Sequence, residues 1–134
     1  MMRFSGSFAL ALSLMLGGLS AGAAEKGGTP SEEAIRFAEA AVPVRGSEAD
    51  EDLQVEVAAR LFEMEQASRP TCTPKLLNAK LVAPEEDGTW VERWFVRGCQ
   101  QILPYRVTFE PDESGAGTTF TAMADVGPYG APSR

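Results

Sequence analysis

Histidine is absent from this 134-residue sequence, and its absence removes several kinds of chemistry. Histidine is the usual general base near neutral pH and the commonest nitrogen ligand for metals. Without it, neither a Ser-His-Asp triad nor a Cys-His pair can be built. A zinc site would need four ligands drawn from two cysteines and scattered carboxylates, which matches no ordinary zinc site. We therefore expect no metal and no cofactor.

Positive charge is also scarce, with 12 Lys and Arg against 19 Asp and Glu side chains and a formal net charge of −7. A chain of this balance is repelled by phosphate backbones and by anionic lipid surfaces. We therefore expect no nucleic acid among its partners and no binding to membranes.

Long apolar runs are missing too. The apolar run from Phe8 to Leu19 has 12 residues, whereas a transmembrane helix needs about 20. It follows Arg3 and precedes Ala21-Gly22-Ala23, an order that predicts a signal peptide over residues 1–23. Its removal would take Arg3 with it and leave 111 residues of net charge −8. We expect a periplasmic or secreted protein with no membrane anchor after cleavage.

Two helices are expected after a flexible leader at residues 24–28. Thr29-Pro30-Ser31-Glu32 predicts a helix start, with Thr29 as the cap and Glu32 completing a capping box. A second capping signal at residues 47–50 precedes a helical stripe of Leu53, Val57, Leu61 and Met64. Residues 53–57 also alternate as a strand would, but the stripe continues for three turns and favours a helix. Glu63, Glu65 and Gln66 are expected on its exposed face.

Four strands are expected next, over residues 75–83, 89–98, 103–110 and 118–124. Turn-forming residues separate them at 84–88, which includes Asp87-Gly88, and at 111–117. Helices followed by a run of strands predict an α+β fold, with one or two N-terminal helices packed on a four-stranded antiparallel meander. We expect a single monomeric domain over residues 29–125 and a loose C-terminal tail over 126–134.

The two cysteines flank the first predicted hairpin. A turn at residues 84–88 brings residue 72 opposite about residue 100, so Cys72 and Cys99 should meet and form a disulfide in an oxidising compartment. Such a bond would stabilise the fold by roughly 3.5 kcal/mol. The alternative is a reactive redox pair, which usually has Cys-x-x-Cys spacing.

The second strand has two contrasting faces. Trp90, Glu92 and Trp94 share one face, and we interpret them as structural core residues, with Glu92 paired to an arginine or a backbone donor. In the alternative interpretation this face points outward, and the two indoles form a platform for a sugar or peptide.

The opposite face carries Arg93, Phe95 and Arg97, and Arg106 of the third strand can join them. This basic, partly aromatic surface is a possible binding surface for an anionic ligand or an acidic partner segment. The alternative is that these arginines pair across strands with Glu110 and other carboxylates.

The stretch from Trp90 to Cys99 resembles small secreted bacterial proteins of uncharacterised function that carry a Trp-x-Glu-x-Trp-x-Val-x-x-Cys-Gly pattern. The resemblance covers about residues 57–124 and includes a turn near Gly115 before the last strand. It departs from the pattern at Gln100, where the family has glycine, and at an inserted Ala116. It implies a disulfide, a sheet and a bacterial envelope setting, and it implies no activity.

These observations predict a non-catalytic binding or interaction domain whose partner is an envelope protein or a small ligand. One alternative is an enzyme that uses carboxylates alone, with Glu92 as acid or base. Another is a structural envelope protein without a ligand.

Overall fold

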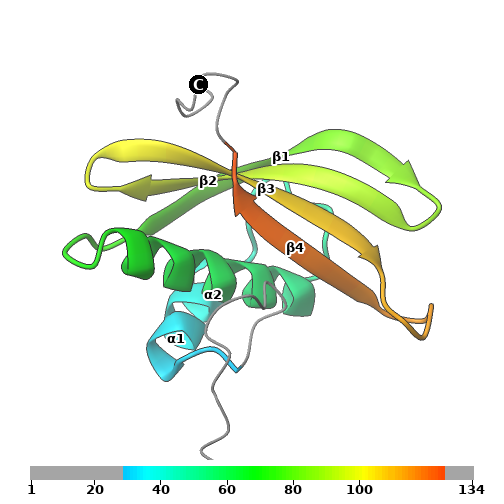
Figure 1. Cartoon of the computed structure of the whole chain (residues 1–134), viewed down its shortest axis with the longest axis horizontal. Coiled ribbons are helices and arrows are strands. Elements are labelled where there is room, and N and C mark those ends of the chain that lie inside the picture. Colours follow the sequence, from blue (N-terminus) through cyan, green and yellow to red (C-terminus); the bar gives the residue numbers. More distant parts are fainter. Residues whose placement is uncertain (1–28, 126–134) are drawn as a thin grey trace, which may run out of the picture.

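The computed structural model describes residues 29–125, and within them two helices precede four strands (Figure 1). The predicted signal peptide, the leader and the C-terminal tail lie outside the described residues. The strands form one antiparallel sheet in the order β1-β2-β3-β4, so the predicted α+β meander is confirmed. The elements are α1 (Glu32–Ala41), α2 (Glu51–Ser68), β1 (Lys75–Glu86), β2 (Thr89–Gly98), β3 (Gln101–Pro111) and β4 (Thr118–Ala124).

Helix α1 begins later than its sequence signal indicated. Ser31 is the N-cap, because its side-chain oxygen accepts a hydrogen bond from the backbone N–H of Ala34 at 3.2 Å. The Ser31 N–H in turn donates to Glu63 of α2 at 3.1 Å. The predicted roles of Thr29 as cap and Glu32 as capping-box partner are therefore wrong, since a residue from the second helix supplies the carboxylate.

The first hairpin is longer than predicted. Strand β1 continues to Glu86, because the turn consists of only Asp87 and Gly88, whose φ angles are 53° and 80°. Two positive φ angles are the requirement of the tight type I′ hairpin turn, which Asp-Gly favours. Pro84 is accommodated within β1 because β1 is an edge strand.

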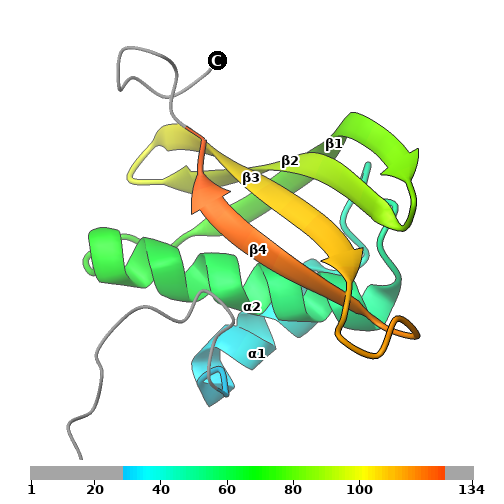
Figure 2. The same cartoon turned by 45° about the vertical axis from the view of Figure 1, so that its right-hand side comes forward.

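Both helices lie on the same side of the sheet (Figure 2), and the core fills the space between the two layers. Val57 and Leu61 of α2 are fully buried, as are Val107 and Phe109 of β3. The ring of Trp90 stacks on Phe109 with centroids 4.5 Å apart. The apolar faces predicted from helical and strand periodicity thus meet in one core.

The segment between α1 and α2 is fastened to the edge of β1. The carbonyl oxygen of Arg45 accepts a hydrogen bond from the N–H of Ala79 at 2.8 Å. Gly46 makes this approach possible, because its φ is +91° and a Cβ at this position would lie 1.9 Å from the Ala79 oxygen.

The predicted disulfide between Cys72 and Cys99 is present, with Cα atoms 5.3 Å apart. It joins the segment that follows α2 to the turn between β2 and β3. Cys99 and Gln100 form that turn with φ angles of 49° and 68°. Two consecutive non-glycine residues in the left-handed region are costly.

We expect Gly46→Ala to lower the free energy of unfolding by about 3 kcal/mol, because the new methyl group overlaps the Ala79 carbonyl. Gly115→Ala is the matched control: its φ is +73°, but nothing lies within 4 Å of its Cβ position, so only about 1 kcal/mol of backbone strain is added. Urea unfolding measures both variants. Equal losses would contradict the close contact at Gly46.

Gln100→Gly should raise the free energy of unfolding by about 0.5 to 1 kcal/mol, because glycine adopts the left-handed conformation without the Cβ penalty. Gln101→Gly, at the first residue of β3, should instead be neutral or destabilising. Thermal unfolding of the oxidised protein distinguishes the two outcomes, and a destabilised Gln100→Gly variant would contradict the role given to this turn.

Candidate functional site

The outer face of the sheet, turned away from the helices, collects positive charge from three strands. Lys80 of β1 lies beside Arg93 of β2, and Arg93 lies beside Arg106 of β3. Lys75 lies beside Arg97 in the same way. We call this set the basic face, and it consists of Lys75, Lys80, Arg93, Arg97 and Arg106. The alternation along the second and third strands predicts the three arginines of the basic face. The two lysines could be assigned to it only from the register of β1.

Apolar side chains lie among these charges. Phe95 occupies the position between Arg93 and Arg97 on β2 and is half-buried. Ile102, which pairs with Arg97, is 53% exposed, and Met123, which pairs with Arg106, is 58% exposed. The basic face therefore combines charge with accessible apolar surface, a composition typical of interaction sites.

Most of the positive charge on this face is unpaired within residues 29–125. Arg93 donates from Nε to a carboxylate oxygen of Asp125 at 2.6 Å, whereas the predicted partner Glu110 forms no ion pair within that range. Lys80, Arg97 and Arg106 likewise have no ion pair among the described residues. Like charges on directly opposed strands are destabilising, and the ion pair with Asp125 offsets part of the repulsion between Arg93 and its neighbours Lys80 and Arg106.

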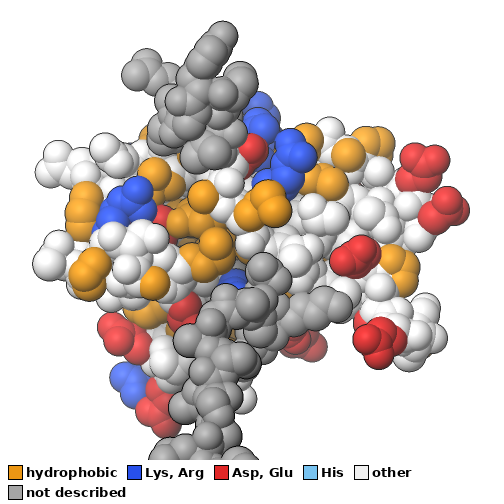
Figure 3. All heavy atoms as spheres, viewed as in Figure 1, with side chains coloured by type: hydrophobic (Ala, Val, Ile, Leu, Met, Phe, Trp, Pro, Cys, Tyr) orange, Lys and Arg blue, Asp and Glu red, His pale blue; other side chains and the backbone are white. Residues whose placement is uncertain are grey.

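Negative charge gathers elsewhere on the molecule. Figure 3 shows Lys and Arg side chains over the sheet with an acidic side chain beside them. It shows Asp and Glu side chains at the hairpin ends and around the helical layer, where a basic side chain lies among them. Exposed carboxylates on the helices include Glu33, Glu39, Glu51 and Glu56. The acidic net charge of the chain is thus distributed unevenly, and the basic face is its positive side.

The inner face of β2 carries a fully buried carboxylate. Glu92 is 0% exposed and accepts four hydrogen bonds. Two come from the indole nitrogens of Trp90 and Trp94, at 3.1 and 2.7 Å. The others come from the Ser47 hydroxyl at 2.9 Å and the Glu48 backbone N–H at 2.7 Å. The structure turns both indoles toward the helical layer, with Trp94 fully buried and Trp90 half-buried.

This geometry suits an internal anchor. A carboxylate has about four lone-pair positions, and all four of Glu92 are occupied by donors from the sheet and from the loop before α2. Of the two expected kinds of partner, a backbone donor is present in Glu48, and no arginine is among the donors within residues 29–125. The two indoles were not expected as donors. The Trp-x-Glu-x-Trp spacing indicates that the indoles lie beside the carboxylate, because residues i, i+2 and i+4 of a strand share one face.

A second buried carboxylate lies near the other end of α2. Glu65 is 1% exposed. It accepts a hydrogen bond from the hydroxyl of Tyr105 and from the Arg69 guanidinium at 3.3 Å. Burial raises the pKa of Tyr105 well above its usual range, and the hydrogen bond to Glu65 adds to this effect. The prediction that Glu65 is exposed was wrong, although its place four residues after Leu61 continues the buried stripe.

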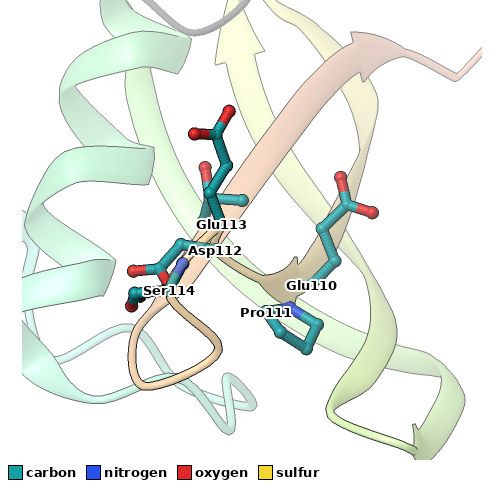
Figure 4. Close-up of a pocket in the computed structure, with 6 residues that line it drawn as sticks. Glu110, Pro111, Asp112, Glu113 and Ser114 are labelled. Atoms are coloured by element: carbon teal, nitrogen blue, oxygen red, sulfur yellow. Dashed lines mark hydrogen bonds between the residues drawn. The ribbon is translucent and has the colours of Figure 1, made fainter.

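An open surface hollow of about 590 Å³ lies at the turn between β3 and β4. It is lined by Glu110, Pro111, Asp112, Glu113, Ser114 and Thr119. Figure 4 shows the three carboxylates pointing in different directions. Asp112 accepts hydrogen bonds from the hydroxyl and from the backbone N–H of Ser114, which lower the pKa of this carboxyl. Within residues 29–125, no group of three or more Cys, Asp or Glu side chains is placed to hold a metal ion.

The comparisons with known proteins add no assignment. No family model matches the chain, and neither the curated proteins nor the solved structures gave a match. Among the described residues, no helix has the length and apolar character needed to cross a membrane.

Glu92→Gln should lower the free energy of unfolding by about 3 kcal/mol. The amide NH2 group of glutamine cannot accept hydrogen bonds, so two of the four buried donors around it would lose their acceptor. Glu110→Gln, an exposed carboxyl on β3, should change stability by less than about 0.5 kcal/mol. Urea unfolding followed by tryptophan fluorescence measures both. A Glu92→Gln variant as stable as the parent would contradict the anchoring role.

Proposed function

We propose that this protein is a non-catalytic binding domain of the periplasm or the extracellular space, and that it binds an anionic partner on the basic face. The observation that carries the proposal is the row Lys80–Arg93–Arg106, in which three cations lie side by side on three strands. A surface that gathers like charges in an otherwise acidic molecule is stabilised when an anion covers it.

The compartment is supported by the disulfide between Cys72 and Cys99, because such bonds persist in oxidising compartments. The order of residues in segment 1–23 supports the same compartment.

The internal use of the buried carboxylates supports binding over catalysis. Glu92 and Glu65 are both buried acids. The hydrogen bonds of Glu92 join the loop before α2 to the sheet, and the bond of Glu65 joins α2 to the sheet. The exposed groups of the basic face are long cations beside Phe95 and Met123, which suit recognition of carboxylates. An acidic segment of an envelope protein fits this surface.

A labelled octaglutamate peptide tests the proposal. It should bind the parent protein at low ionic strength, and its affinity should fall as salt screens the contacts. Arg97→Ala/Arg106→Ala should weaken binding about 10-fold, because each exposed charge contact contributes up to about 1 kcal/mol. Fluorescence anisotropy measures the affinity.

The matched control is Arg36→Ala/Arg45→Ala, which removes the same charge from α1 and the segment after it. Arg36 is exposed and, within residues 29–125, pairs with Glu32 on its own helix alone, and Arg45 contacts β1 through its backbone. This control should change the affinity less than 2-fold. Equal weakening by both double variants, or no binding at low salt, would contradict the proposal.

A further inference from the structure

The two edge strands of the sheet, β1 and β4, differ in the features that protect an edge against the addition of another strand. Edge strands expose unpaired N–H and C=O groups, and proteins protect them with charges, prolines, bulges or covering loops. Strand β1 has all of these devices: Lys75 and Lys80, Pro84, register shifts after Leu76 and Leu81, and the Arg45 carbonyl bonded to Ala79.

Strand β4 has none of these devices. Its sequence, Thr-Thr-Phe-Thr-Ala-Met-Ala, contains no charge and no proline. Its register with β3 runs without a shift from Pro111–Thr118 to Tyr105–Ala124. Within residues 29–125, β4 makes backbone hydrogen bonds to no element other than β3. Every second residue therefore directs its N–H and C=O toward an open edge.

The positive charge beside the β4 edge indicates the kind of strand that could pair with it. Met123 of β4 faces outward next to Arg106, and Arg106 lies next to Arg93. A fifth strand would place its outward side chains beside Met123, within reach of the long Arg106 side chain. Its inward side chains would lie over the helical layer, where α2 packs beneath β4. The matching segment alternates acidic and apolar residues.

We propose that an extended acidic segment of a partner protein adds to β4 as a fifth antiparallel strand, with its carboxylates turned toward the basic face. This inference rests on the proposed function, because it names how the anionic partner is held. Main-chain hydrogen bonds supply affinity in this mode, and the alternating side chains supply specificity. Figure 1 shows β4 at the near edge of the sheet, with β1 at the far edge.

The experiment uses the full chain and an eight-residue peptide that alternates glutamate and valine. We expect binding with at least 10-fold stronger protection of the backbone amides of residues 118–124 against hydrogen exchange. A fully N-methylated peptide of the same sequence should not bind, because it has no N–H donors. Met123→Glu should weaken binding at least 10-fold, whereas Met123→Lys, a change at the same exposed position, should keep or strengthen it.

The outcomes separate this inference from the proposed function. If the N-methylated peptide binds as well as the parent peptide and residues 118–124 gain no protection, strand addition is overturned while charge-based binding stands. If neither the alternating peptide nor octaglutamate binds, both proposals fall. If the protein alone sediments as a dimer with protected β4 amides, a second copy occupies the edge and the acidic segment is overturned.

Discussion

The buried carboxylate of Glu92 is the contact on which the arrangement of the two layers depends. A charge with no exposure is costly unless donors surround it, and Glu92 has four: two indoles from its own strand and two groups from the loop before α2. Because these donors come from both layers, the requirement to satisfy one charge fixes where the loop meets the sheet. The approach of Gly46 to Ala79 follows from the same placement.

A comparable arrangement holds the other end of α2. Glu65 binds the Tyr105 hydroxyl of β3, and the disulfide joins the segment after α2 to the β2–β3 turn. A buried acid therefore joins the loop before α2 to the sheet, and another joins the C-terminal part of α2 to the sheet. On the outer face Arg93 is paired with Asp125, whereas Lys80, Arg97 and Arg106 form no ion pair among the described residues and can contact a partner.

Local patterns predicted most of the fold because strands and helices bury residues at fixed spacing. Strands β2 and β4 have the predicted bounds, and the alternation along β2 separated the tryptophans from the arginines. The N-cap of α1 is local, because Ser31 accepts from the Ala34 N–H three residues later. The carboxylate that binds the Ser31 N–H could not be predicted locally, since Glu63 lies on another helix. The burial of Glu65 was missed because a charged residue is expected outside unless its partners are known. One partner, Arg69, is four residues away, but the buried partner, Tyr105, is 40 residues away.

The sequence by itself determined the elements, the α+β order, the pairing of Cys72 with Cys99 and the composition of each face of β2, because all of these follow from spacing along one strand or one hairpin. Only the tertiary structure decided which side chains from other elements contact the residues on each face of β2. It placed Ser47 and Glu48 on Glu92 and aligned Lys80 with Arg93 and Arg106. Within residues 29–125 it also bonded the α1–α2 loop to the edge of β1 and paired β4 with β3 alone. These outcomes depend on register and on the docking of distant segments, which periodicity does not encode.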